Sequence, residues 1–489
     1  MMLAKIKELT KDTAVYGLST IVGRFLNFLL VPYYTNVLAP DALGVYSNVY
    51  AYLAFMNIVY LYGTDVAFMK YAAFERSSKK TIFSTAYLSV FATSVFLTLI
   101  LLAFRAPLEN LTRLSGGYED IFPFVVFVLY FDAIAVIPFA NLRLERKTTR
   151  FALIKLANIL INLGLNILFI SYFKMGIKGI FLANLIASAF TFVAVLPEIF
   201  RYFDFSFNFP FWKKILKFGL PYLPASMAAM LVQVADRPIL LELQGKEAVG
   251  IYSANYKLGI FMMLFVSMFQ YAWQPFYLNN AKEPNAKNIF AKVMTIFLVV
   301  ASVIWITLSL FIDDIVRIEI LSGRYFIGEN YWSGTFIVPM ILLAYVFNGI
   351  NVNLQAGFYI EEKTKYLPVV TFVGAVINII SNLLLIPVYG IFGAALATLF
   401  SYAAMSLVSF TLTRKFYPIK YEYGKIVSML LLLAVATVGY YTFFADADFS
   451  FASKLLILAG YVVLMFAFKI VNATDLKYLG KLLGISKAK

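Results

Sequence analysis

The sequence contains no cysteine and no histidine among its 489 residues. Their absence excludes disulfides, and it excludes metal sites or catalysis that depend on a thiolate or an imidazole. Charged residues are also scarce, at 14% of the chain against roughly 25% in ordinary soluble domains. A soluble fold of this length needs more polar surface than that, so a cytosolic enzyme is excluded.

Hydrophobic residues make up 62% of the chain, and the mean hydropathy is +0.82. A membrane-spanning helix needs about 20 mostly apolar residues. Fourteen such segments are predicted, near residues 13–37, 44–68, 81–104, 119–140, 151–172, 177–199, 215–242, 248–273, 288–312, 331–357, 366–387, 390–413, 425–444 and 450–471. The predicted fold class is therefore all-α, a polytopic membrane protein with 14 transmembrane helices.

The net charge of +15 is explained by the distribution of Lys and Arg between the two sides of the membrane. With these spans, 30 of the 41 Lys and Arg residues fall on the side of both termini, 8 on the opposite side and 3 at membrane depth. Cytoplasmic loops carry such an excess of positive charge. Both termini are thus expected in the cytoplasm, and nucleic-acid binding is not needed to explain the charge.

The loops are too short to fold as separate domains, which argues against an enzyme with a catalytic domain outside the membrane. We divide the chain by its predicted spans. The expected parts are a cytoplasmic amphipathic segment (1–12), an N-lobe of six spans (13–200), a cytoplasmic linker (201–214), a C-lobe of six spans (215–414), two further spans (415–472) and a cytoplasmic basic tail (473–489).

An internal repeat relates spans 1–6 to spans 7–12. The pattern AxG[VI]YSxxY occurs at 42–50 and again at 248–256, an offset of 206, which also places Pro32 on Pro238. Further matches at offsets of 214–216 pair 145–148 with 361–364, 162–166 with 378–382 and 176–179 with 390–393. Each half holds an even number of spans, so the halves are parallel repeats, an architecture typical of transporters that work by alternating access.

Several segments resemble the polysaccharide transporter branch of the MOP flippase superfamily, the Wzx-type flippases. They are YGLSTIVGRFLNFLLVPYYTNVLAPDALGVYS at the start, then GTDVAFMKYA, NLRLERKTTRF, AWQPFY and EEKTKYLP. The resemblance implies a flippase that moves undecaprenyl-diphosphate-linked oligosaccharide to the outer leaflet of the bacterial inner membrane. It also implies a cleft lined with basic residues, a role in O-antigen or other surface polysaccharide biosynthesis, and contact with membrane lipid and polysaccharide assembly proteins.

Six ionisable residues lie inside the predicted spans, where each costs about 2.5–3.5 kcal/mol if it faces lipid. They are Arg24, Asp65, Asp132, Asp236, Arg237 and Lys257. The three bases are candidates for binding the diphosphate, because Arg offers forked donors and Lys a mobile charge. The alternative is charge pairing within the bundle.

The three acids are candidates for coupling transport to H⁺ or Na⁺, and no other cofactor or metal site is expected. Asp132 is the deepest of them, whereas Asp65 lies near the cytoplasmic end of its span. Neighbours on a helix point about 100° apart. Asp236 is therefore expected to pair with Lys257 or Arg24 across the bundle and not with Arg237.

Prolines interrupt the first and seventh predicted spans and bend a helix by removing a backbone hydrogen bond. Pro32 lies in the first span, and Gly219, Pro221 and Pro224 lie in the seventh. The segment from Gly219 to Pro224 is the predicted hinge, with a static kink as the alternative.

The sequence thus predicts a flippase for a lipid-linked oligosaccharide. Two other transporters stay open: a MATE-like cation-coupled multidrug antiporter and a MurJ-like lipid II flippase. A membrane-embedded polymerase or ligase is disfavoured because a large outward loop with clustered acids is missing.

Overall fold

The computed structural model describes residues 28–72, 78–444 and 450–470, which form two compact units. One unit ends at Ser253 and the other begins at Ala254. Predictions for the N-terminal amphipathic segment, for most of the first span and for the basic tail lie outside the described residues.

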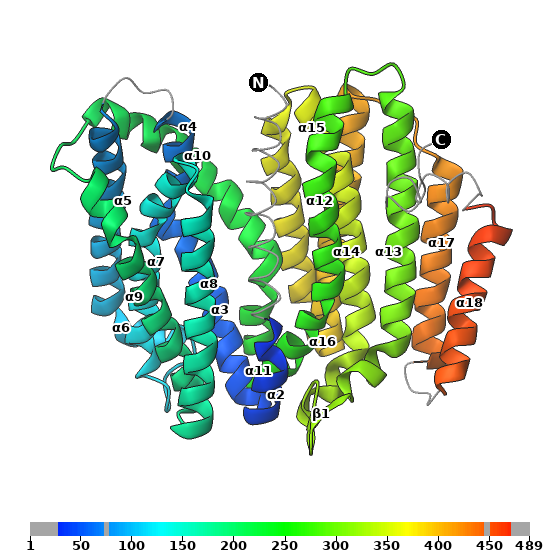
Figure 1. Ribbon diagram of the computed structural model, residues 1–489. Helices are drawn as coiled ribbons and strands as arrows, with labels where there is room; N and C mark the ends of the chain where they lie inside the picture. The colour runs from blue at the N-terminus through cyan, green and yellow to red at the C-terminus, as the bar shows by residue number, and fades with distance from the viewer. Residues whose placement is uncertain (1–27, 73–77, 445–449, 471–489) are drawn as a thin grey trace. The chain divides into compact units, whose positions relative to one another are not determined.

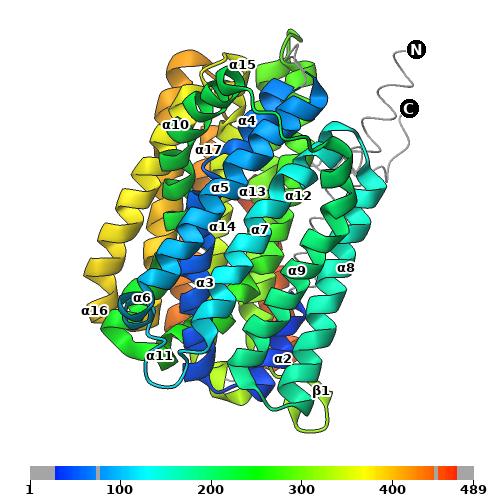
Figure 2. The same cartoon turned by 90° about the vertical axis from the view of Figure 1, so that its left-hand side faces the viewer.

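The first unit consists of helices (Figure 1). They are α2 (Leu30–Val37), α3 (Pro40–Leu61), α4 (Thr64–Ala72), α5 (Lys79–Ala103), α6 (Arg105–Leu111), α7 (Ile121–Leu144), α8 (Thr148–Ile167) with a π-helical end (Leu168–Tyr172), α9 (Gly176–Tyr202), α10 (Phe209–Val234) and α11 (Asp236–Tyr256), which crosses the unit boundary. Helices α5, α7, α9 and α8 pack in a row in that order (Figure 2).

The second unit is also helical apart from one short hairpin. Its elements are η2 (Lys257–Gly259), α12 (Ile260–Asn280), α13 (Ala286–Val316), β1 (Glu319–Leu321), β2 (Arg324–Tyr325), η3 (Glu329–Ile337), α14 (Val338–Leu354), α15 (Ala356–Ile360), η4 (Thr364–Tyr366), α16 (Leu367–Phe416), α17 (Tyr423–Gly439), η5 (Tyr440–Phe444) and α18 (Phe451–Ala467). Helix α14 packs on α16, while α17 and α18 lie against α13 (Figure 1).

Ten helical segments of the described residues are long and apolar enough to cross a membrane, and α18 is a shorter apolar helix. Two of the ten, Phe209–Asn280 and Thr364–Phe416, each cover two predicted spans. Each contains a glycine with non-helical backbone angles, Gly245 (φ 86°) or Gly390 (φ 54°). This glycine forms a kink between two helices, so each segment can hold two spans. The polytopic all-α fold is confirmed. The count of 14 stays a prediction, because residues 1–27 are outside the described part.

Equivalent residues of the two repeats have the same local structure. The Asn166 side-chain amide donates to the backbone and side-chain oxygens of Asn162, at 2.8 and 3.0 Å. Asn382 does the same to Asn378, at 2.9 and 3.0 Å. These pairs are 216 residues apart, which supports the repeat recognised in the sequence.

The ends of α7 and α15 are a second matched feature. Each is followed by a residue in the left-handed region, Arg146 (φ 54°) and Glu362 (φ 53°), again 216 residues apart. In both places the next amide donates back to a carbonyl in the helix, from Lys147 at 2.8 Å and from Lys363 at 2.7 Å. This is the hydrogen-bond pattern of a left-handed helix cap.

The segment 203–208 joins α9 to α10 inside the predicted cytoplasmic linker, and its polar and aromatic residues alternate. The backbone N–H groups of Asp204 and Asn208 donate to Ser84 Oγ (2.7 Å) and Thr85 Oγ1 (2.9 Å) of α5. Phe205, between them, is 91% exposed. The polar contacts therefore fix the linker on α5 while Phe205 points away from the protein.

Candidate functional site

The predicted basic residues have different environments. Arg24 lies outside the described residues. Lys257 is partly buried and begins η2. Arg237 lies in the first turn of α11, where its Nη1 atom is 2.6 Å from Oδ1 of Asp236. Its side chain is 12% exposed and its guanidinium is 5.8 Å from the ring centre of Tyr252.

The expectation that Asp236 would not pair with Arg237 is wrong. Asp236 opens α11, so the long Arg237 side chain reaches back to it and to the carbonyl of Gln233. The second carboxylate oxygen of Asp236 accepts a hydrogen bond from Tyr252 Oη at 2.5 Å. Asp236 is 1% exposed, and a buried carboxylate needs such partners. In this arrangement Arg237 has a structural counter-ion, and its role in binding substrate stays a prediction.

The other two predicted acids lie in separate parts of the first unit. Asp65 is partly buried in the first turn of α4, where the helix dipole favours negative charge. No ion pair to Asp65 occurs among the described residues. Lys70, in the last turn of the same helix, has its Nζ atom 4.2 Å from the ring centre of Phe218. Asp132 lies halfway along α7, where Ser188 of α9 hydrogen-bonds to it and Lys155 of α8 interacts with its charge.

The predicted hinge is helical throughout, because α10 continues through Pro221 and Pro224. A side chain on Gly219 would lie 2.5 Å from the carbonyl oxygen of Tyr62, so this glycine permits close packing of α10 on the junction of α3 and α4. The interruption of the seventh predicted span lies at Ala235, between α10 and α11. Pro32 lies in α2, and its carbonyl accepts a hydrogen bond from the Asn36 amide at 2.7 Å. The hinge role stays a prediction.

The duplicated motif forms a helix–helix contact within the first unit. A Cβ atom on Gly44 of α3 would lie 1.8 Å from the carbonyl oxygen of Lys246, and a Cβ atom on Gly250 of α11 would lie 1.8 Å from that of Pro40. Gly250 is the repeat equivalent of Gly44, and Lys246 is the equivalent of Pro40. The contact is therefore reciprocal, as at a two-fold axis. The repeat located both glycines in the sequence but did not indicate that they meet.

Charged and aromatic side chains nearby tie α11 to the loop between α6 and α7. Arg113 makes a bidentate contact with Glu242 of α11, at 3.1 and 2.7 Å. The Nζ atom of Lys246 is 5.8 Å from the ring centre of Tyr118. The predicted topology places these residues on the outer side of the membrane. In the first unit, α11 thus packs against both α3 and the α6–α7 loop on the predicted outer side.

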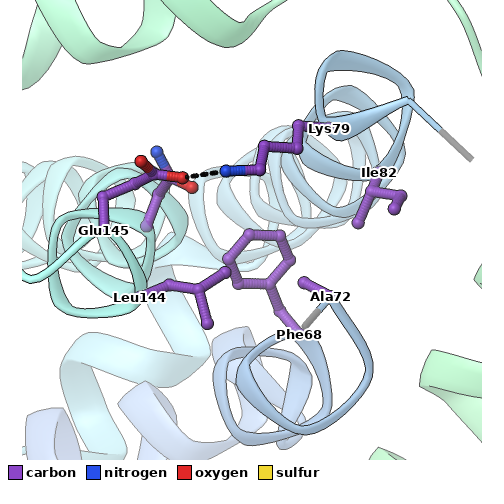
Figure 3. A pocket seen from close by; sticks show the side chains of 7 residues that line it. Phe68, Ala72, Lys79, Ile82, Leu144 and Glu145 are labelled. Atoms are coloured by element: carbon purple, nitrogen blue, oxygen red, sulfur yellow. Dashed lines mark hydrogen bonds and ion pairs between the residues drawn. The ribbon is translucent and has the colours of Figure 1, made fainter. Parts of the chain in front are cut away.

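On the predicted cytoplasmic side, a cavity of about 230 Å³ lies between α4, α5 and α7. It is lined by Phe68, Ala72, Lys79, Ile82, Asn141, Leu144 and Glu145. Figure 3 shows the Phe68 ring pointing into it below the Lys79–Glu145 ion pair, which is 2.9 Å long. The hydrogen bond from Lys79 lowers the pKa of the Glu145 carboxyl.

A buried glutamate adjoins this cavity and was not among the predicted site residues. Glu198 of α9 is fully buried and accepts hydrogen bonds from Asn141 Nδ2 (2.9 Å), Lys147 Nζ (2.9 Å) and Arg150 Nη1 (3.3 Å). The NLRLERKTTR stretch supplies all three donors. Its high density of positive charge was the sequence feature that could have indicated a buried acidic partner. The cluster ties α9 to the end of α7 and the start of α8.

Comparison with known proteins agrees with this architecture. Residues 9–280, more than half of the chain, match the family described as "Polysaccharide biosynthesis protein". No curated protein matches at significant sequence similarity.

Solved structures of transporters share the fold. The lipid II flippase MurJ in an inward closed conformation has a TM-score of 0.72 at 17% identity, covering 94% of this chain and 98% of that one. An inward-facing MATE multidrug transporter of the MOP superfamily has a TM-score of 0.66 at 14% identity, with 80% and 94% covered. A MOP transporter from Pyrococcus furiosus, described as having a binding pocket of reverse polarity, has a TM-score of 0.57 at 14% identity, with 83% and 95% covered. The repeat, the helical architecture and the family match agree, and the chain belongs to the polysaccharide biosynthesis protein family.

Proposed function

We propose that this protein moves an undecaprenyl-diphosphate-linked oligosaccharide from the cytoplasmic to the outer leaflet of the bacterial inner membrane. The observation that carries the proposal is a duplicated helical architecture in a chain of the polysaccharide biosynthesis family. Two repeats that rock against each other expose a site to alternate sides of the membrane. The activity is transport, with no chemical change in the substrate.

Arg24, Arg237 and Lys257 are the proposed contacts for the diphosphate. A phosphate oxygen accepts charge-assisted hydrogen bonds from Arg and Lys, each stronger than a neutral one. The polyprenyl chain stays in lipid while the head group crosses. We also propose that transport is coupled to an ion and feeds a surface polysaccharide such as O-antigen, together with assembly proteins of that pathway.

The test is reconstitution into liposomes with a fluorescent undecaprenyl-diphosphate oligosaccharide, scored by protection from a membrane-impermeant quencher. We expect R24A to slow translocation by about tenfold or more, because one hydrogen bond to a charged group contributes about 1.5–3 kcal/mol. The matched control is R324A, since Arg324 is exposed on the β1–β2 hairpin. Equal rates in R24A and wild type would remove Arg24 from the site.

The same vesicles separate the alternative transporters. Lipid II in place of the oligosaccharide lipid tests a MurJ-like substrate. Flux of a cationic dye without movement of either lipid would support a MATE-like antiporter and contradict the proposal.

A further inference from the structure

Asp132 lies in a group of polar side chains inside the first unit. Ser188 hydrogen-bonds to its carboxylate, and the charged or ionisable side chains that interact with it in the described residues are Lys155 of α8 and Tyr50 of α3. The side-chain amide of Asn184 donates to Tyr50 Oη at 2.5 Å. Three helices thus direct polar groups at the middle of α7.

The polar groups continue along the helices beside α3. The rings of Tyr46 and Tyr50 are 4.6 Å apart, and the rings of Tyr34 and Tyr46 are 5.6 Å apart. Tyr34 Oη donates to Asn166 Oδ1 at 2.9 Å, and both residues are buried. By the predicted topology, this series of hydroxyl and amide groups leads from Asp132 toward the outer ends of α2 and α8.

The second repeat shows which residues occupy the equivalent positions when these charges are absent. At the offset of 216 that relates the helices, Asp132 corresponds to Asn348 of α14 and Lys155 corresponds to Thr371 of α16. Asp132 and Asn348 are both partly buried. Helix α14 packs on α16 as α7 packs on α9, without a carboxylate or an ammonium at these positions.

Packing therefore does not require the two charges. An ionised side chain at membrane depth costs about 2.5–3.5 kcal/mol on an insertion scale, so it is retained where it serves a function. Asn and Thr preserve hydrogen bonding at the equivalent sites of the second repeat. At these two positions, only the first repeat has side chains that can gain or lose a charge.

We propose that Asp132 is a proton-binding site in the first repeat, with Ser188, Tyr50 and Lys155 as its polar surroundings. A proton is favoured over Na⁺ because a metal ion needs several oxygen ligands, whereas a proton needs only one carboxylate oxygen. Water supplies the proton, which binds a carboxylate oxygen of Asp132. The negative charge that faced Lys155 is then lost, and Lys155 becomes free to attract an anionic head group.

Proton binding can be measured without transport. Infrared difference spectra of the reconstituted protein between pH 5 and pH 8 should contain the C=O stretching band of a protonated carboxyl group. We expect D132N to lose this band and the control E283Q to keep it, because Glu283 is exposed in the loop after α12. A band of unchanged intensity in D132N would overturn the proposal.

The double variant D132N/K155T copies the second repeat and tests folding separately. We expect its melting temperature to equal or exceed that of the wild type. A fall of several degrees would mean that the charges serve the fold, and it would contradict the proposal.

Coupling, unlike the binding site itself, rests on the proposed transport function. In vesicles, we expect a pH gradient to accelerate wild-type translocation at least threefold and to leave D132N at the rate without a gradient. If the wild type moves no lipid, the proposed transport function fails while the infrared result still decides the proton site. If D132N responds to the gradient as the wild type does, coupling through Asp132 is excluded.

Discussion

Gly44 and Gly250 occupy the same place in two copies of one sequence motif, and they pack against each other. Each helix approaches so closely that a Cβ atom on either glycine would lie 1.8 Å from a carbonyl oxygen of the other helix. Small residues allow such close approach of membrane helices. The contact joins equivalent positions of the two copies of the motif within the first unit.

Alanine at Gly44 should force α3 and α11 apart. We expect G44A to destabilise the protein by about 1–3 kcal/mol, as other overpacked sites do. The control is G164A, because nothing lies within 4 Å of a Cβ atom there and the position is helical. Alanine is favoured over glycine in helices by about 0.5–1 kcal/mol, so G164A should be neutral or stabilising. Melting curves in detergent measure both. Equal effects would contradict the close contact.

The ion pair between Arg113 and Glu242 should contribute only slightly to the stability of the fold. Both side chains are about half exposed, at 52% and 54%, and water and salt screen their attraction, so the pair should contribute little to stability. We expect R113E and E242R each to lower the melting temperature slightly and the double variant R113E/E242R to restore it. A double-mutant cycle with no coupling energy would show that the two side chains do not interact.

Glu198 should matter far more to stability than Glu145. E198A leaves the buried Asn141 amide and two cations without their acceptor, a loss of about 2 kcal/mol. Glu145 has the exposed Lys79 as its partner, so E145A should stay within about 0.5 kcal/mol of the wild type. Thermal unfolding of E198A and E145A under the same conditions shows which variant loses more stability. Equal losses would contradict the prediction.

The Glu145 ion pair also predicts a pH effect. Because Lys79 lowers the pKa of Glu145 in the folded protein, the pair stabilises the fold at neutral pH. This contribution is lost as the pH falls from the ordinary glutamate pKa of the unfolded chain, about 4.3, through the lowered pKa of the folded protein. The melting temperature of E145Q should therefore fall less than that of the wild type when the pH is lowered from 6 to 3. Parallel curves would mean that the pair contributes nothing.

Phe205 should insert into the cytoplasmic leaflet. It is 91% exposed on a linker between two spans, and aromatic side chains favour the membrane interface. Because the chain has no native cysteine, F205C can be spin-labelled as a single site. We expect the label to be more accessible to dissolved oxygen than to a water-soluble nickel reagent, with E283C showing the reverse. A nickel accessibility equal to that of E283C would place Phe205 in water.

Hydropathy and charge determined the helical class, the spans within the described part and the expected orientation, because burial in lipid acts on each segment of about 20 residues locally. The repeat was visible too, since duplicated local structure, such as the Asn162–Asn166 and Asn378–Asn382 pairs, preserves residue types at fixed spacing.

Only the tertiary structure decided which side chains meet. It paired Asp236 with its own neighbour Arg237, joined Glu198 to the NLRLERKTTR stretch and brought Gly44 against Gly250. Such contacts depend on helix rotation, helix ends and side-chain reach over long sequence separations. Hydropathy does not specify these, because any apolar face satisfies lipid equally well.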